Sequence, residues 1–598
     1  MFKKRFLPVL LCLPLLVVAC LLSVALTLGS GSSPVAGFEG LRGDLDGDGA
    51  LTAYDLTLYL RYLSGSVSLS DDALALADMN GDGKVDEADM QLLQQYLSGE
   101  GISVGLRVAY VPLDNRPVNL DRAVYLAASC GLELVMPEEH LFRTALDNME
   151  PNPDGGTLGN RKALLEWLRE ADKTCDAFVI SLDQMLSGGL VGSRWLDNTD
   201  LTFEYEVIDE IARLCENNTV ILFDTVMRLA STTGYQGWGM EEYNTLRSYG
   251  QVARKQLTGS ELTVENIIAG YRYDANGKKI PFGHTDATLN RYLASRERKL
   301  RIADYLLRNA GDKMDSLYLG VDDSSPQVTI QTNEINYLTG LLGEKGVLSA
   351  GTDELGLCSL TRMATLLYGS PKVHVTYYGP GKDMPADSWD IETLGNMVGT
   401  HLDFLNVVET DDAKNALQVL ILTRGSSRSD RQSLLAQAKK NLNNHIPTML
   451  LDVSLQASEL DTMMFSESDI QIGMLMGYSS WNTAGNATGL ALSLGISRYA
   501  YLSFVPESTP AANEAFLKSM AFAYIKDISY KTFHGSISGI MNEDYTCSAP
   551  LILRRLNTSK IVTALSPYGE SSHGEVKVSG FRYPWNRTFE MTFDIEIG

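Results

Sequence analysis

The sequence predicts two fold classes in one chain: a small all-α pair of calcium loops, followed by a large α/β region with mostly parallel strands. An acidic loop occurs twice near the N-terminus, which predicts the first part. The remainder alternates short continuous apolar runs with amphipathic helical patterns, which is typical of parallel sheets covered on both faces. At 598 residues, the chain also exceeds the length of one ordinary domain.

Residues 1–33 have the pattern of a targeting segment. Three basic residues, Lys3, Lys4 and Arg5, precede a run without charges that extends from Phe6 to Ser33. The run reaches the roughly 20 apolar residues that span a bilayer, so it is either a cleaved signal peptide or a membrane anchor. The basic flank sends the rest of the chain outside. We therefore expect a secreted or cell-surface protein that touches the membrane only through this segment, if uncleaved.

Two loops within residues 38–100 have the ligand spacing of calcium sites. Oxygen ligands at loop positions 1, 3 and 5, a backbone carbonyl at position 7 and a carboxylate at position 12 surround one Ca²⁺. The predicted ligands of two ions are Asp44, Asp46, Asp48, Ala50, Asp55, Asp78, Asn80, Asp82, Lys84 and Asp89. An Asp at position 12 departs from the Glu of an ordinary EF-hand.

The two loops are copies of one unit. Each precedes a helical apolar stripe, and the copies match to their ends, with Tyr62-Leu63-Ser64-Gly65 aligned against Tyr96-Leu97-Ser98-Gly99. Residues 43–99 resemble a type I dockerin, the calcium-dependent plug module of cellulosomal enzymes. The alternatives are an ordinary EF-hand pair or an acidic linker. The resemblance implies a cohesin domain of a scaffold protein as partner, bound through Ala53, Tyr54, Arg61, Glu87, Ala88 and Gln95.

Composition argues against several kinds of partner and cofactor. The 74 acidic and 50 basic residues give a net charge of −24, which repels a phosphate backbone, so no nucleic-acid partner is expected. Five cysteines outside the targeting segment lack metal-ligand spacing and are predicted to be buried thiols. The large region shows no motif for a phosphate cofactor or zinc, so calcium is the expected cofactor.

Residues 105–598 carry the α/β pattern. After a first apolar run at 107–112, strands are predicted near 133–136, 177–182, 219–224, 316–321, 347–351, 373–378, 418–423, 448–452 and 472–477. Helical patterns such as 161–170 and 290–309 separate them. Because these strands are too many for a simple barrel, we expect a barrel-like or open domain, then a second α/β part divided from it near 370–410. Alternation from Val576 to Ile597 predicts a terminal antiparallel strand pair.

Polar residues collect where the predicted strands end, which is where ligands bind in parallel α/β folds. Six such clusters begin at Asp114, Ser181, Asp224, Asp322, Thr352 and Ser479. Segments 110–119, 181–194, 321–326, 351–356 and 477–489 resemble the uncharacterised secreted bacterial family DUF4127. The family has no established activity, so the resemblance groups these residues without naming a reaction.

These clusters supply the candidate active-site residues. The catalytic candidates are Asp322, Asp323, Asp353, Glu354 and Asp183, since converging carboxylates can divide into a protonated acid and an ionised base or nucleophile. The substrate-binding candidates are Asp114, Arg116, Arg194, Arg228, Glu334, Trp481, Asn482 and Asn486. The arginines suit an anion, while Trp481 and the asparagines suit a sugar ring. As alternatives, the acids cap helices, the arginines neutralise buried acids, and Trp481 marks a tight turn.

The leading functional hypothesis is a secreted glycoside hydrolase, or another glycan-active enzyme in polysaccharide breakdown, recruited through the dockerin-like module. One alternative is a non-catalytic glycan-binding or scaffold protein. Another is a hydrolase that acts on a substrate outside carbohydrate chemistry, such as cell-wall peptide. The seven histidines are isolated in sequence, which favours carboxylate chemistry over histidine chemistry.

Overall fold

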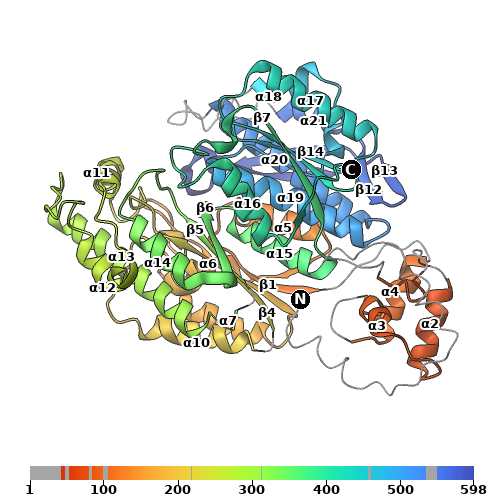
Figure 1. Cartoon of the computed structure of the whole chain (residues 1–598), viewed down its shortest axis with the longest axis horizontal. Coiled ribbons are helices and arrows are strands. Elements are labelled where there is room, and N and C mark those ends of the chain that lie inside the picture. The colour runs from red at the N-terminus through yellow and green to blue at the C-terminus, as the bar shows by residue number, and fades with distance from the viewer. Residues whose placement is uncertain are drawn as a thin grey trace.

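A computed structural model of the chain describes residues 42–47, 51, 53–79, 84–97, 106–216, 218–311, 313–314, 316–454, 459–533 and 549–598. In sequence order these residues form a small helical lobe, a six-stranded sheet with its helices, a five-stranded sheet with its helices, and a C-terminal region (Figure 1). The predicted ligands Asp48, Ala50, Asn80 and Asp82 and the targeting segment lie outside the described residues, as do the side chains of Ala53, Tyr54 and Gln95.

The N-terminal lobe contains the two helices that were expected to follow the calcium loops. Its helices are α2 (Ala53–Leu63), α3 (Asp71–Ala77) and α4 (Glu87–Leu97). Helices α2 and α4 pack together through the buried side chains of Leu58, Tyr59 and Leu93. Arg42 joins this lobe to the body, because it donates hydrogen bonds to the carbonyl oxygens of Asp78 at 2.7 Å and Leu367 at 2.9 Å.

The first sheet is fully parallel and has the strand order β2-β1-β3-β4-β5-β6. Its strands are β1 (Arg107–Val111), β2 (Glu133–Val135), β3 (Ala177–Ser181), β4 (Thr219–Val226), β5 (Ser316–Val321) and β6 (Gly346–Ala350). This is the order of an open, doubly wound sheet, in which ligands bind at the carboxyl ends of the strands. The barrel alternative is therefore wrong for this part of the chain.

Strand side chains alternate between two apolar layers. Val108 and Tyr110 enter one core, whereas Ala109 and Val111 enter the other. Helix α15 packs on one face of the sheet, where it contacts α5. Helices α10, α13 and α14 belong to the second apolar layer, in which α13 contacts both α10 and α14. The helices between β1 and residue 372 are α5 (Asp121–Ser129), α6 (Glu139–Phe142), α7 (Arg161–Ala171), α8 (Leu182–Ser187), α9 (Leu190–Ser193), α10 (Thr202–Leu214), α11 (Met240–Gln251), α12 (Val264–Gly270), α13 (Asp286–Asn309), α14 (Thr332–Leu342) and α15 (Leu355–Tyr368). Burial on both faces explains why these strands are continuous apolar runs.

The second sheet repeats this winding with strands in the order β11-β10-β9-β7-β8, all parallel. Its strands are β7 (Lys372–Tyr378), β8 (Val408–Glu409), β9 (Leu417–Leu422), β10 (Thr448–Asp452) and β11 (Tyr478–Ser479). Its helices are α16 (Leu394–Phe404), α17 (Arg428–Asn443) and α18 (Glu459–Thr462). The sheet begins at Lys372, next to the division that the sequence predicts near 370–410.

One predicted strand is displaced. Residues 472–477 were expected to be extended, but Ile472–Met474 form a 3₁₀ turn and the strand is Tyr478–Ser479. The chain turns here because Gly473 and Gly477 lie against other backbone: an added Cβ would stand 2.6 Å from the carbonyl oxygen of Lys560 and 2.7 Å from the amide nitrogen of Gly495, respectively. An apolar composition alone does not separate a buried strand from such a packed turn.

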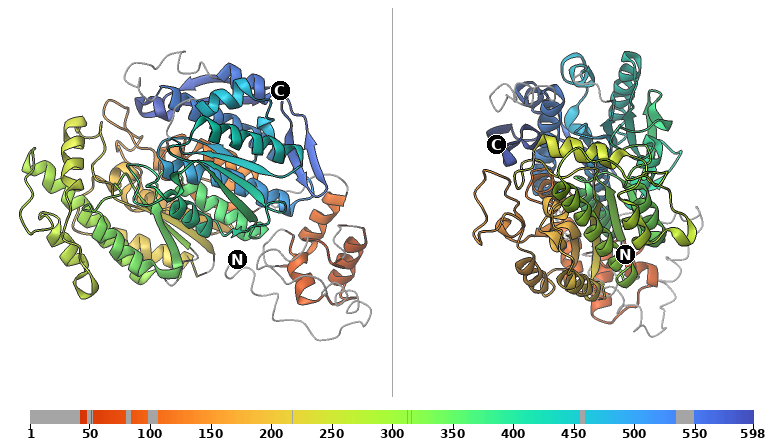
Figure 2. Two further views of the ribbon diagram at one scale, coloured as in Figure 1. Left: turned by 45° about the horizontal axis from the view of Figure 1, so that its top comes forward. Right: turned by 90° about the vertical axis from the view of Figure 1, so that its left-hand side faces the viewer.

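The C-terminal region ties the two sheets together. Helix α19 (Ala484–Phe504) packs on α15, and α20 (Pro510–Phe533) packs on α5 (Figure 2). After α21 (Ala549–Leu556) come the antiparallel pairs β12 (Ile561–Leu565) with β13 (Tyr568–Ser571) and β14 (Val576–Arg582) with β15 (Thr592–Ile597). The second pair confirms the predicted terminal hairpin. Among the described helices, none combines the length and the apolar character that crossing a bilayer requires.

Candidate functional site

A cleft of two adjoining chambers lies between the carboxyl ends of the two sheets. The larger chamber, about 410 Å³, is lined by Asp323 from the first sheet and by Asp452 and Ser480 from the second. The smaller chamber, about 280 Å³, is lined mainly by residues that follow the strands of the first sheet. Both chambers share four lining residues: Asp323, Asn482, Thr483 and Tyr530. The cleft therefore lies where doubly wound sheets bind their ligands.

Three predicted carboxylates meet three predicted arginines around the smaller chamber. These carboxylates belong to Asp322, Asp323 and Asp353. The ion pairs are Arg116 Nη2 to Asp353 Oδ1 at 2.6 Å, Arg194 Nε to Asp322 Oδ2 at 2.9 Å, and Arg228 Nη1 to Asp323 Oδ2 at 3.0 Å. Arg116 also contacts the fully buried Asp114 at 2.9 Å and Glu590 at 3.2 Å. The fold thus brings these charges together, although the partners in the three pairs lie 237, 128 and 95 residues apart in the chain.

The helix-cap alternative does not describe these carboxylates. Helix α15 begins after Glu354 and α14 begins after Gln331, and neither residue makes a side-chain cap hydrogen bond. Ser181 does behave as a cap, because its hydroxyl accepts the N–H of Gln184 at 3.2 Å. The alternative in which arginines neutralise buried acids fits the three ion pairs.

Asp323 has an unusual backbone and an unusual charge environment. Its φ of 20° lies outside the common regions for a residue with a side chain, and such strain is concentrated at functional sites. Burial and the neighbouring Asp322 raise the pKa of Asp323, whereas Arg228, Arg194 and Arg247 act in the opposite direction. Asp323 lines both chambers, so it is the acidic residue most centrally placed in the cleft.

Asp390 is a cleft carboxyl group that was not among the residues predicted from the sequence. It follows Trp389 in the connection between β7 and α16, and a hydrogen bond of 2.8 Å from the Ser324 amide to the Trp389 carbonyl holds this connection against the first sheet. Burial, together with the acidic neighbours Asp387, Asp323 and Glu392, raises the pKa of Asp390 well above its usual range. Its Oδ2 atom is buried and has no hydrogen-bond partner among the described residues. Two acids flanking a tryptophan, Asp387-Ser-Trp-Asp390, were the available signal in the sequence.

Two predicted residues lie in buried ion pairs beside the cleft and do not line it. Asp183 bonds the Lys299 ammonium group, which also bonds Asp224, and it accepts the Thr225 hydroxyl at 2.9 Å. Glu334 bonds Arg296 and the Tyr271 hydroxyl, each at 2.6 Å. Arg296 also donates to the backbone carbonyl of Arg228. Arg296 thus connects Glu334 to the loop that carries Arg228, so Glu334 helps to position that loop.

Trp481 does not reach either chamber. Its side chain is fully buried, with the Lys526 ammonium group 5.3 Å and the Arg122 guanidinium group 5.8 Å from the ring centre. A sugar ring cannot stack on it in this arrangement. Aromatic side chains that do line the cleft are Trp389, Tyr530, Trp585 and Phe589.

The predicted asparagines lie at the cleft. Asn482 lines both chambers, with a φ of 64° and its Oδ1 atom 3.3 Å from the Tyr530 hydroxyl. Asn486 lines the smaller chamber, and its Oδ1 atom accepts the amide of Asp353 at 3.2 Å. Asn486 therefore positions the segment that carries the Asp353 carboxylate.

Glu354 lies beneath the cleft, in a network without solvent contact. Its Oε2 accepts the Thr352 amide at 2.9 Å, and its Oε1 stands 4.0 Å from His401 Nε2. Burial raises the pKa of Glu354 to about 8 and lowers the pKa of His401 to about 4. Both groups are therefore neutral at pH 7, which avoids the cost of two buried charges.

Replacement of Glu354 by Gln should alter how stability depends on pH. The folded wild type keeps this proton up to about pH 8, whereas the unfolded chain releases it near 4.5. The free energy of unfolding of the wild type should therefore fall as the pH rises between these values, by on the order of a few kcal/mol. Gln lacks this titration. The urea midpoint of the variant, relative to that of the wild type, should therefore be higher at pH 9 than at pH 5. A constant difference between the two proteins would contradict the assignment.

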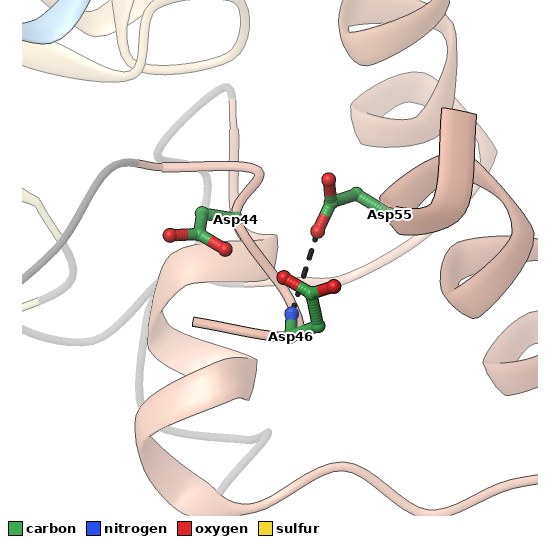
Figure 3. Close-up of side chains that lie close together, drawn as sticks. All are labelled: Asp44, Asp46 and Asp55. Atoms are coloured by element: carbon green, nitrogen blue, oxygen red, sulfur yellow. Dashed lines mark hydrogen bonds between the residues drawn. The ribbon is translucent and has the colours of Figure 1, made fainter. Parts of the chain in front are cut away.

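Three predicted ligands of the first calcium loop, Asp44, Asp46 and Asp55, lie close together. Carboxylate oxygens of Asp44, Asp46 and Asp55 lie within 4.8 Å of one another (Figure 3). Asp55 Oδ1 accepts the amides of Leu45 at 2.8 Å and Asp46 at 3.4 Å, which fixes the position-12 carboxylate against the start of the loop. In the second loop, the position-12 residue Asp89 is buried and accepts the amide of Asp86 at 2.8 Å. Hard oxygen donors gathered in this way fit Ca²⁺.

These features define a class of protein: a calcium-loop plug module joined to paired doubly wound α/β sheets with a charged cleft between them. Residues 42–98 match the dockerin type I domain. Residues 108–594 match a family described as protein of unknown function (DUF4127), and because this match covers more than half of the chain, the chain belongs to that family. No curated protein and no solved structure matches the chain.

The dockerin assignment has direct consequences. A type I dockerin implies calcium binding, a cohesin domain as partner, and an extracellular setting in a cellulosome. The chain is thus a dockerin-bearing protein whose large domain belongs to a family without an assigned reaction.

Proposed function

We propose that the protein is a dockerin-borne hydrolase that cleaves glycosidic bonds in a polysaccharide, and that the reaction takes place in the cleft between the two sheets. One observation carries the proposal: Asp390 and Asp323 line the same chamber in contrasting environments. Burial and acidic neighbours raise the pKa of both groups, and for Asp323 the ion pair with Arg228 opposes that rise. Carboxyl groups whose environments separate their protonation states are what glycoside hydrolysis requires.

Asp390 is the proposed general acid. Its raised pKa favours the protonated form, from which the group can transfer a proton to the oxygen of the leaving sugar. The bond between that oxygen and the anomeric carbon breaks as the proton arrives. Activity should consequently decline as the pH rises through the pKa of Asp390.

Asp323 is the proposed base or nucleophile. Burial and Asp322 raise the pKa of Asp323, whereas its ion pair with Arg228 at 3.0 Å opposes that rise and favours the ionised form. The residue lines both chambers. As a base, it removes a proton from the water that attacks the anomeric carbon. As a nucleophile, it forms a glycosyl ester with that carbon, which water then hydrolyses while Asp390 takes up a proton from that water. Product stereochemistry distinguishes these routes. Asp322 and Asp353, each held by an arginine, support the positive charge that develops on the sugar.

Two calcium ions are proposed for the dockerin domain. The first would be held by Asp44, Asp46, Asp48, Asp55 and the Ala50 carbonyl, and the second by Asp78, Asn80, Asp82, Asp89 and the Lys84 carbonyl. The clustered oxygens of the first loop support this set. Bound calcium organises the surface that docks to cohesin, which delivers the cleft to an insoluble polysaccharide.

The proposal is tested by incubating the full chain with neutral and acidic plant polysaccharides, peptidoglycan and chromogenic glycosides, and by measuring new reducing ends. We expect at least one glycan to be cleaved. Binding without turnover across the panel would favour the alternative of a non-catalytic glycan-binding protein. Release of amines from peptidoglycan, without new reducing ends, would favour a hydrolase of cell-wall peptide.

A further inference from the structure

The smaller chamber is lined by four guanidinium groups, from Arg116, Arg194, Arg228 and Arg587. The first three each form a short ion pair with a carboxylate: Asp353, Asp322 and Asp323, respectively. Their charges are therefore already compensated by the protein. Any capacity for a further anion has to come from the fourth arginine.

Arg587, unlike the other three arginines, is not paired with a carboxylate among the described residues. Its Nη2 donates to the carbonyl oxygen of Thr233 at 2.8 Å. In the part of the chain that the structure describes, Arg587 has no carboxylate within ion-pair distance, and its Nε and Nη1 atoms form no hydrogen bond to protein. Burial, and the positive charges of Arg116, Arg228 and Arg194, lower the pKa of Arg587 to about 10 despite the opposing effect of Glu590. An anion in the chamber would relieve this repulsion.

The protein holds Arg587 in place by a strained turn. The two preceding residues, Trp585 and Asn586, have φ values of 57° and 54°, a region that side-chain-bearing residues rarely occupy. The Trp585 ring has Arg116 at 5.0 Å and Arg587 at 5.6 Å from its centre. Its Nε1 atom donates to the Asn115 side chain at 3.4 Å. This turn brings a C-terminal arginine to the carboxyl end of β1, some 470 residues away along the chain.

We propose that the smaller chamber is an anion subsite in which Arg587 binds the carboxylate of an acidic sugar residue of the substrate. A guanidinium fork matches a carboxylate with two parallel hydrogen bonds. One uncompensated arginine suits a single negative charge, which favours a carboxylate over a doubly charged phosphate. Arg194 and the Thr232 hydroxyl, 3.2 Å apart, complete the polar wall.

This inference rests on the proposed function, because it places the acidic sugar next to the bond that Asp390 and Asp323 would cleave. Arg587 lines only the smaller chamber, whereas Asp323 lines both. The larger chamber then binds the neighbouring sugars of the polysaccharide. The substrate class is accordingly an acidic glycan, one whose repeating unit includes a uronic or other carboxylated sugar.

The test is calorimetric titration of the full chain with monosaccharides, which have no glycosidic bond to cleave. The acidic probes are glucuronate, galacturonate and N-acetylmuramate, and their neutral counterparts are glucose, galactose and N-acetylglucosamine. At least one acidic sugar should bind tenfold or more tightly than its neutral counterpart. Arg587→Met should remove that preference, and Arg587→Lys should lose most of it, because an ammonium group keeps the charge without the fork.

Arg582→Met is the matched control, since Arg582 is exposed on β14 and pairs with Asp594. Circular dichroism verifies that each variant is folded. Equal binding of acidic and neutral sugars, or a preference that survives in Arg587→Met, would overturn the inference. Inorganic phosphate binding more tightly than every acidic sugar, in a manner that depends on Arg587, would overturn the assignment to a carboxylate. Turnover of neutral glycans that does not depend on Arg587 would support the hydrolase proposal and contradict the anion subsite. Binding of acidic sugars through Arg587 without turnover of any glycan would support the subsite and contradict the hydrolase proposal.

Discussion

The Asp390→Asn variant should lose about a hundredfold or more of the turnover on whichever glycan the wild type cleaves. An amide cannot transfer the proton that the leaving sugar needs, and a lost general acid or base costs on the order of 10²–10⁴ in rate. Burial and acidic neighbours raise the pKa of this carboxyl group and so favour its protonated form, which the neutral amide mimics closely. The fold should therefore survive, and initial rates measured beside circular dichroism spectra separate the two effects.

Companion variants sharpen this experiment. Asp323→Asn should also lose about a hundredfold or more, since it removes the proposed base or nucleophile. Asp411→Asn is the matched control, because Asp411 is exposed in the connection before β9 and lies outside the cleft. The alkaline decline of the wild-type pH profile should be absent from the residual activity of Asp390→Asn. Full activity in Asp390→Asn would show that the acid lies elsewhere.

Removal of calcium should unfold the dockerin domain and abolish cohesin binding, while the large domain stays folded. Carboxylates of Asp44, Asp46 and Asp55 lie within 4.8 Å of one another and repel when no cation lies between them. The lobe is short and has a small core, so it cannot offset that repulsion without the ion. We expect two ions per chain in a calcium titration. In EDTA, the unfolding transition of the N-terminal lobe should be absent.

Single substitutions locate the two ions. Asp44→Ala and Asp78→Ala should each reduce the stoichiometry from two ions to one, because each removes the position-1 ligand of one loop. Asp72→Ala is the control, since Asp72 is an exposed residue of α3 outside both loops. If the full chain takes up no calcium, or if chelator leaves cohesin binding unchanged, the calcium assignment fails.

The sequence predicted the features that depend on local pattern. Strands buried on both faces, such as Ala177–Ser181, are continuous apolar runs, and the acidic loops have a fixed ligand spacing. The position of Asp322 and Asp353 followed from a rule of topology, because parallel strands direct their carboxyl ends to one edge of the sheet. These parts of the fold and the site are therefore predictable from the sequence alone.

The remaining parts depend on tertiary packing that leaves little trace in a local window. Asp390 and Arg587 reach the cleft from connections in other parts of the chain, and their chemistry comes from neighbours that are distant in sequence. Asp183 follows a strand just as Asp322 does, yet Lys299 from α13 pairs with it away from the chambers. Trp481 stands in a polar segment but is covered by Arg122 and Lys526. Sequence pattern identifies which residues carry chemistry, and packing decides which of them face a ligand.

The most direct test of the central claim is a crystal structure of the full-length Asp390→Asn variant, soaked with an oligosaccharide of the glycan that the wild type cleaves. The account predicts a sugar chain that spans both chambers, with one glycosidic oxygen within hydrogen-bond distance of residue 390 and the anomeric carbon beside Asp323. A sugar chain bound outside the cleft, or bound there with its glycosidic oxygen away from residue 390, would contradict it.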